Sequence, residues 1–370
     1  MNYKDRIRQL AQLNNSYIID LKTSPDDKSP PTQASSEFTI KREQGDWAER
    51  LVQKLINNNG VQKNLVAVHY GKSDNLVAGE PRFEELYEAY QKELKSIGKR
   101  PDLLIFEAKD YNNDWNFDIS CLPKETLDQI VPRAIAGLEV RSSSFLVDQY
   151  NRDTEEELGN LRQQLLRLRD ETIGSFGNIL PKKVLEALQN ANEENLENLK
   201  FKNTSLKDAK NNESIANMSE NLEHIRKLRD QIKAKITKRD YLSFTPKVED
   251  LYFILKWIET YGIPHYYFQV FFDRVYGISF ERILDVISKS ENKNKLFTIE
   301  KHDKNQFKQT IHVRLDQGVQ VAQITTIPTH TSDMKQLSKG RLLFYVKFEN
   351  GEARLCIENL LRLLNLTNGT

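Results

Sequence analysis

Cysteine is nearly absent from this chain of 370 residues, and long hydrophobic runs are missing altogether. The two cysteines, Cys121 and Cys356, are too few for a disulfide scaffold or for a zinc site built on cysteine. No apolar run approaches the length of about 18 residues that spans a membrane, and the first segment, MNYKDRIRQL, lacks the apolar core of a secretory signal. We therefore expect a cytoplasmic protein with no membrane partner.

An excess of charge of one sign is also missing, because 54 lysines and arginines face 53 aspartates and glutamates, a net charge of +1. A neutral total does not exclude nucleic acid as a partner, since a local basic surface is enough to bind phosphates. The six histidines show no metal-binding spacing, and GKSDN lacks the other features of a phosphate-binding loop. These absences argue against a histidine-based metal site and against nucleoside triphosphate binding.

Hydrophobic periodicity divides the chain into four segments. Residues 1–45 hold a short helical pattern and a turn-rich linker, and residues 46–149 alternate helices and strands as the first part of a core. Residues 150–240 are polar and carry two leucine-rich helical patterns, which predict a helical hairpin inserted into that core. Residues 241–370 return to helices and short strands, with ENG at 349–351 as a hairpin turn. This order predicts an α/β (α+β) fold, a mixed sheet flanked by helices.

Two patterns in these segments concern packing. In GDWAERLVQKLINNNG (45–60), Trp47, Leu51 and Leu55 form one apolar stripe, which is typical of a helix lying against a core. His265, within PHYYFQ, is expected to be a packed core histidine rather than a ligand.

The stretch GKRPDLLIFEAKDY at 98–111 combines Pro-Asp, a buried-strand pattern and Glu-Ala-Lys, which together are the residue set of a metal-dependent nuclease. Phosphodiester hydrolysis with Mg²⁺ needs carboxylates that converge on one or two cations. Within one strand, however, Asp102 and Glu107 would lie roughly 16 Å apart and on opposite faces. These two carboxylates cannot share one metal ion.

A second strand supplies a better partner for Asp102. In GLEVRSSSF, Glu139 follows 37 positions later, which leaves room for a loop and a second strand, and Arg141 shares its face. A carboxylate on so apolar a strand needs a partner or a metal. Asp102 and Glu139 are therefore candidate metal ligands. The alternatives are that Asp102 caps a turn and that Glu139 and Arg141 form a structural pair on an edge strand.

The strands RPDLLIF and LEVRSSSF resemble the core of the PD-(D/E)xK nucleases, and longer runs resemble one branch, the AccI-type type II restriction endonucleases. Those runs are GDWAERLV, YGKSDNLVAGEPRFEELYEAYQKELKSIGKRPDLLIF, LEVRSSSF, LSFTPKVEDL and IPHYYFQVFFDRVYGISFERIL. The resemblance implies a Mg²⁺-dependent homodimer that cuts double-stranded DNA at a short palindrome, and a cognate DNA methyltransferase. It implies Asp102 and Glu139 as metal ligands and Glu49, on the helix DWAERLV, as an assisting acid. The alternative for Glu49 is a solvated helix charge.

Arg141 departs from this family pattern, because it stands where these nucleases usually carry a lysine. Arginine is always protonated, so Arg141 cannot act as a base, although it can steady the charge on the phosphate. Lys109 and Lys247 are other candidates for the lysine role. Two alternative functions stay open: a nuclease of repair or non-specific cleavage, and a DNA-binding protein whose catalysis the change to Arg141 has weakened.

A restriction enzyme also needs contacts to DNA. The basic run at 226–239 either binds phosphates or forms a solvated helix face, and the inserted hairpin would embrace DNA or extend a dimer interface. Base edges are read by amide and cationic side chains, and phosphates are held by cations. The candidate DNA-binding residues are Lys99, Arg100, Ser142, Asn305, Gln306 and Lys308.

Overall fold

The computed structural model describes residues 2–13, 34–60, 64–72, 76–201, 213–237, 241–302 and 305–366. The chain divides into two compact units. The first unit consists of Met1–Val147 together with Leu242–Thr370, and the second is Asp148–Tyr241. The first unit is thus made of two separate stretches of sequence, with the second unit inserted between them. No helix in these ranges is long and apolar enough to cross a membrane.

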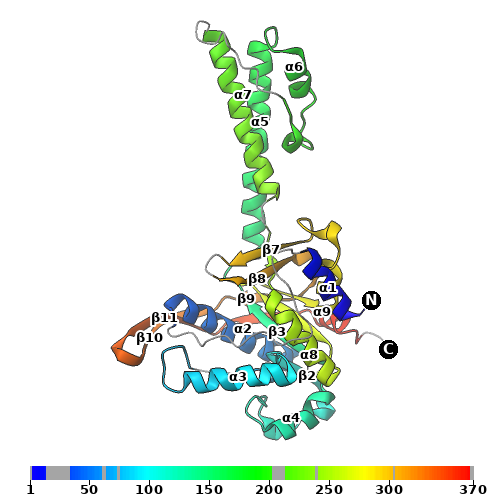
Figure 1. Cartoon of the computed structure of the whole chain (residues 1–370), viewed down its shortest axis with the longest axis vertical. Helices are drawn as coiled ribbons and strands as arrows, with labels where there is room; N and C mark the ends of the chain where they lie inside the picture. Colours follow the sequence, from blue (N-terminus) through cyan, green and yellow to red (C-terminus); the bar gives the residue numbers. More distant parts are fainter. Residues whose placement is uncertain are drawn as a thin grey trace. The chain divides into compact units, whose positions relative to one another are not determined.

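A mixed sheet forms the centre of the first unit (Figure 1). Neighbouring strands run antiparallel except β3 and β5, which are parallel and join the two stretches of sequence. The prediction of a mixed sheet flanked by helices is confirmed. Within the described residues its seven strands are, in spatial order, β1 (Leu65–His69), β2 (Leu103–Glu107), β3 (Ala136–Ser142), β5 (His265–Val270), β6 (Arg274–Ser279), β9 (Val319–Thr326) and β12 (Glu352–Leu355).

Helices pack on both faces of this sheet, so its central strands are buried on two sides. Side chains along a strand alternate between faces, and in β5 Tyr266 and Phe268 join one apolar cluster while Tyr267 joins another. The helices of the unit are α1 (Tyr3–Leu13), α2 (Ser36–Gly60), α3 (Phe83–Ile97), α4 (Lys124–Ile130), α8 (Leu251–Tyr261), α9 (Phe280–Ile287) and α10 (Ile357–Leu363).

The long helix α2 covers the face of the sheet to which Tyr266 and Phe268 point. Its predicted stripe of Trp47, Leu51 and Leu55 is buried in that cluster, as the periodicity indicated. The helix begins at Ser36, earlier than the predicted start at Gly45. Gly45 is accommodated inside the helix, where the packing of the rest of α2 outweighs its low helical propensity.

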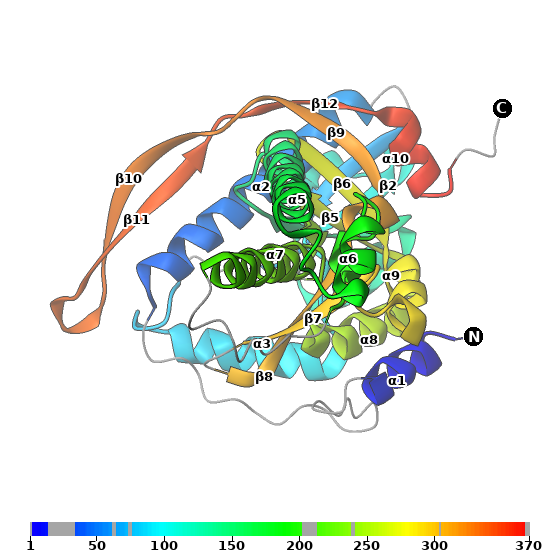
Figure 2. The same ribbon diagram turned by 90° about the horizontal axis from the view of Figure 1, so that it is seen from above.

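The predicted hairpin turn at 349–351 is wrong. The strand before it, β11 (Leu342–Glu349), pairs with β10 (Thr329–Gln336), whereas β12 after it pairs with β9. The register is continuous across the two pairs, from Thr326↔Glu352 to Thr329↔Glu349. Together the four strands form one bent antiparallel ribbon (Figure 2), and the chain reverses at 337–341.

The physical reason is that the turn-like residues bend a strand instead of reversing it. Asn350 and Gly351 both have positive φ, 60° and 98°, which a two-residue turn and a bend in a strand can equally use. Trp47 Nε1 donates a hydrogen bond to Asn350 O at 2.8 Å, so the bend is attached to α2. Strand β10 was not predicted at all, because it is polar and mostly exposed.

A smaller sheet of three strands lies in the same unit: β4 (Ser243–Phe244), β8 (Asn305–Arg314) and β7 (Phe297–His302). The second unit is helical, with α5 (Val147–Phe176), α6 (Lys182–Gln189) and α7 (Glu213–Thr237). The two predicted amphipathic helices are present as α5 and α7. Their leucine and isoleucine stripes share one apolar cluster, for example Leu165 with Ile225. Helix α6, which was not predicted, adds Val184 and Leu188 to that cluster.

Gly98 fixes the approach of α3 to α8. It ends α3 with a φ of 86°, and a Cβ built there would lie 2.2 Å from Phe253 O and 2.5 Å from Trp257 N. The next residue, Lys99, donates its backbone N–H to Phe253 O at 3.0 Å. Only glycine allows this backbone contact, so Gly98 determines where Lys99 leaves the helix.

Replacement of Gly98 by alanine should therefore lower the free energy of unfolding by about 3 kcal/mol, because both the positive φ and the contact with α8 are lost. Gly45→Ala is the matched control, since nothing lies within 4 Å of a Cβ at that helical position. That control should gain about 0.5–1 kcal/mol from helix propensity. Urea unfolding measures both. Equal stability of the Gly98 variant and the native chain would contradict this account of the contact.

Candidate active site

The pairing of β2 with β3 brings the two predicted metal ligands together. The strands are antiparallel, with Leu103 opposite Leu138 and Leu104 opposite Gly137. Continued by one residue, this register sets Asp102 opposite Glu139. Val140 N–H donates a hydrogen bond to Asp102 Oδ2 at 2.7 Å, which fixes the aspartate beside β3. Carboxylates that are 37 positions apart in sequence thus become direct neighbours across two strands.

Glu139 is almost fully buried, with 1% of its surface exposed. Its Oε1 atom accepts from Lys99 Nζ at 2.5 Å and lies 2.6 Å from Arg141 Nη2. Burial opposes ionisation of Glu139, but the charges of Lys99 and Arg141 outweigh it and hold its pKa below the usual value. Its other oxygen, Oε2, has no hydrogen-bond partner among the described residues. Glu139 is therefore an ionised carboxylate with one oxygen held and one available.

The pKa of Asp102 is shifted in the opposite direction to that of Glu139. Burial, and then the neighbouring charge of Glu139, raise the pKa of Asp102 to about 7, although Lys99, Arg141 and the Val140 N–H favour its ionised form. Two adjacent carboxylates repel each other, and a divalent cation between them would relieve the repulsion. The pair is thus poised to bind a cation.

Asp250 is a member of the site that sequence reasoning missed. It lies at the end of a short 3-10 turn, Val248–Asp250, directly before α8. Its Oδ2 atom lies 2.9 Å from Lys99 Nζ and 3.3 Å from Arg141 Nη2. Burial opposes its ionisation, but Lys99 and Arg141 lower the pKa of Asp250 to about 2. In sequence it stands in LSFTPKVEDL, where an acid before a helix is typical of a cap and gives no sign of a catalytic site.

The pKa of Glu49, on α2, is also shifted by the carboxylates of this site. Burial, and then the charges of Asp102, Asp46 and Glu139, raise the pKa of Glu49 to about 10. This shift favours the protonated form of Glu49, which can donate a hydrogen bond. This carboxyl group differs in that respect from the ionised Glu139.

Comparison with known proteins now identifies the kind of protein. The model of the AccI restriction endonuclease family matches residues 1–370, which is the whole chain. The chain belongs to the AccI restriction endonuclease family. No curated protein and no solved structure matches it. The protein is thus a type II restriction endonuclease, a site-specific deoxyribonuclease whose substrate is DNA, as the resemblance implied.

In this AccI-family chain, the other cations singled out from sequence lie in different surroundings. Lys109 is exposed and pairs with Glu107 at 2.6 Å, at the end of β2 remote from Asp102. Lys247 is near Asp250, and burial lowers the pKa of Lys247 despite that negative charge. Arg100 pairs with Glu93 at 2.5 Å, so it is engaged within the fold. Of the lysines considered, Lys99 alone contacts Glu139.

The remaining predicted residues are placed as follows. Ser142 is the last residue of β3, opposite Val270. Asn305, Gln306 and Lys308 belong to β8, but their side chains lie outside the described residues. His265 is a packed core histidine, as predicted, with its ring 6.0 Å from Trp257 and 5.7 Å from Tyr267.

The residues of the AccI-family site fit Mg²⁺. Glu139 Oε2 is a buried oxygen without a partner, and it lies next to a second carboxylate that repels it. No group of three or more histidine, cysteine, aspartate or glutamate side chains in the described part of the chain is arranged to hold a metal. Mg²⁺ does not require one, because it is commonly held by one or two carboxylates with water and substrate phosphate.

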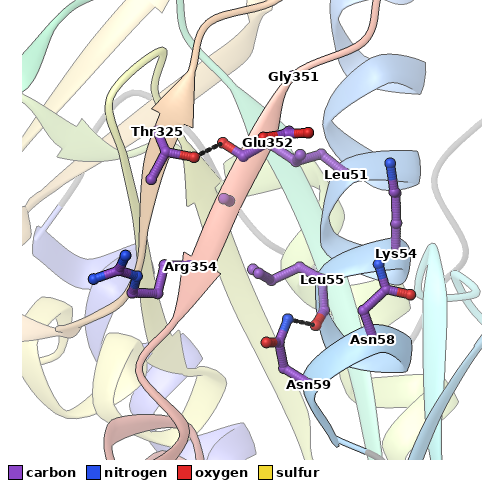
Figure 3. A pocket seen from close by; sticks show the side chains of 10 residues that line it. Leu51, Lys54, Leu55, Asn58, Asn59, Thr325, Gly351, Glu352 and Arg354 are labelled. Carbon is purple, nitrogen blue, oxygen red and sulfur yellow. Dashed lines mark hydrogen bonds between the residues drawn. The ribbon is translucent and has the colours of Figure 1, made fainter.

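A pocket of about 410 Å³ lies at another place in the unit, between α2 and the strands β9 and β12 (Figure 3). Lys54, Asn58 and Arg354 are among the side chains that line it, and Thr325 Oγ1 donates a hydrogen bond to Glu352 O at 3.2 Å. None of the predicted metal ligands lines this pocket. Asp102 directly precedes β2 and Glu139 lies within β3, so the candidate active site is a separate place in the unit.

Replacement of Glu49 by glutamine should stabilise the metal-free protein more at pH 8 than at pH 5. The folded state keeps a proton that the unfolded chain loses near pH 4.5, so stability falls as the pH rises from about 4.5 towards 10. Glutamine removes this dependence. Thermal melting of both proteins at the two pH values, without divalent cations, measures the difference. An equal difference at both pH values would show that the pKa of Glu49 is ordinary.

Proposed function

We propose that this restriction endonuclease hydrolyses the phosphodiester bonds of double-stranded DNA with Mg²⁺ held by Asp102 and Glu139, on strands equivalent to the PD-(D/E)xK core. The observation that supports this is the β2–β3 register, which sets these two carboxylates side by side and leaves Glu139 Oε2 without a partner. When bound, Mg²⁺ would activate a water molecule and neutralise the charge that develops on the phosphate.

The protein's own groups then have distinct tasks. Lys99 and Arg141 hold Glu139 Oε1, which orients the carboxylate and keeps it ionised. Arg141 cannot take a proton from water, so it acts through its charge on the phosphate as negative charge develops there. Glu49, whose protonated form is favoured beside Asp102 and Glu139 in the metal-free site, would assist as a hydrogen-bond donor.

The membership of the family supports a proposal for the enzyme's specificity and its assembly. A short palindromic site has two-fold symmetry, and a homodimer with the same symmetry presents one active site to each strand. We propose that form for this protein, in the cytoplasm, together with a cognate DNA methyltransferase that protects the host's own copies of the site. The alternatives are a repair or non-specific nuclease and a catalytically weakened DNA-binding protein.

Digestion of a plasmid of known sequence tests this function. With Mg²⁺, we expect discrete bands whose ends map to one short palindrome, and sedimentation of the free protein should give the mass of two chains. A smear would favour the non-specific nuclease. An uncut plasmid that the protein nevertheless binds would favour the weakened DNA-binding protein.

The site itself is tested by Glu139→Gln, which should lower the rate of cleavage by at least roughly 1,000-fold, because a neutral amide cannot replace the ionised ligand. Binding to the same DNA in Ca²⁺ should persist. Glu107→Gln is the matched control: it changes a glutamate on the neighbouring strand β2 and should cleave at the native rate. Cleavage by the Glu139 variant at the native rate would show that the site is elsewhere.

A further inference from the structure

We propose that Asp250 is a positioning residue of this active site, and that Lys99, the amine it positions, is the site's second cation beside Arg141. The proposal rests on the proposed function, because it concerns the surroundings of Glu139. It adds a carboxylate and an amine from two segments that lie far from β3 in the sequence.

Four charged groups form a closed arrangement of alternating sign. Lys99 Nζ lies 2.5 Å from Glu139 Oε1 and 2.9 Å from Asp250 Oδ2. Arg141 Nη2 lies 2.6 Å and 3.3 Å from the same two oxygens. Each cation thus contacts both anions through single shared atoms. Such an arrangement fixes all four groups together, because displacement of one removes a partner from each of two others.

The four groups are also sheltered from water. The exposed fractions of the side chains are 1% for Glu139, 14% for Lys99, 19% for Asp250 and 27% for Arg141. Ion pairs at this degree of burial are screened less than those at the surface, so each partner has a measurable effect on the others.

The backbone supports the same contact. Lys99 follows Gly98, and its N–H bonds to Phe253 O in α8, three residues after Asp250. Lys99 is therefore attached to the start of α8 by its backbone and by its amine. Side-chain capping of α8 does not explain Asp250, because the residue makes no side-chain cap hydrogen bond there.

Asp250 sets the charge balance around Glu139. With it, two cations are shared between two carboxylates. Without it, Lys99 and Arg141 would both bear on Glu139 alone, and their charges would compete with a divalent cation for that carboxylate. Asp250 thus leaves Glu139 Oε2 free for the cation while keeping Lys99 in place.

The test is the affinity for Mn²⁺ alone, measured by calorimetry, and the Mg²⁺ concentration that gives half-maximal cleavage. Asp250→Asn should weaken both by about tenfold, as is usual for groups that support metal ligands, and saturating Mg²⁺ should restore much of the rate. Glu249→Gln is the matched control, because Glu249 Oε2 instead accepts from the backbone of Gln309 at 3.3 Å. That control should change neither quantity. Thermal melting establishes that each variant is folded.

Lys99→Met tests the other half of the proposal and does not depend on the folding of the Asp250 variant. Removing this cation should leave Mn²⁺ affinity equal to that of the native protein or higher, while cleavage falls by about 100-fold. The variant that carries both Asp250→Asn and Lys99→Met should bind Mn²⁺ more tightly than the sum of the two single changes in binding free energy predicts, because Asp250 acts through Lys99.

Unchanged Mn²⁺ affinity in a folded Asp250→Asn protein would overturn the role of Asp250, and native cleavage by Lys99→Met would overturn that of Lys99. Asp102→Asn separates these failures from failure of the metal site. If Asp102→Asn binds Mn²⁺ as tightly as the native protein, the proposed function itself is overturned. If Asp102→Asn binds Mn²⁺ more weakly but Asp250→Asn does not, the metal site stands and only the role of Asp250 is rejected.

Discussion

The contact of Glu139 Oε1 with Lys99 and Arg141 is the interaction on which the site depends. Glu139 lies on a strand that is covered by packed side chains on both faces. An ionised carboxylate in such a place costs free energy unless it is paired with a cation. The two cations supply that pairing from different segments. One is on β3 itself, and the other enters between α3 and α8, so the geometry of the site and the packing of these helices cannot vary independently.

Much of the sheet was predictable because its signals are local. The apolar run of β2 and the stripe on α2 reflect burial that each segment shows in its own sequence. The bend at Asn350 and Gly351 was misread, because the same residue types make a hairpin and a bend within a strand. What decides between them is the contact of Trp47 with Asn350 O, about 300 positions away in sequence, which no local pattern contains.

In the candidate site too, the residues that local patterns indicate could be predicted, and those brought in by distant contacts could not. Asp102 and Glu139 could be predicted as neighbours because distance and alternation exclude Glu107 as a partner, and those rules need only the geometry of a strand. Asp250 could not be found this way. Its contact with Lys99 exists only after α8 has packed against α3 at Gly98, and its position before a helix suggests nothing more than a cap. Lys99 was noticed as a cation near DNA, but its partners were not.

The arginine at position 141 is understandable once Lys99 is considered with it. Burial and the charge of Arg141 disfavour the charged form of Lys99, but Asp250 and Glu139 outweigh both and raise the pKa of Lys99. Arginine does not lose its proton under these conditions, so Arg141 keeps its charge beside Lys99. The departure from the usual residue at this position is therefore consistent with a site in which the amine comes from a residue just before Asp102 instead of one just after Glu139.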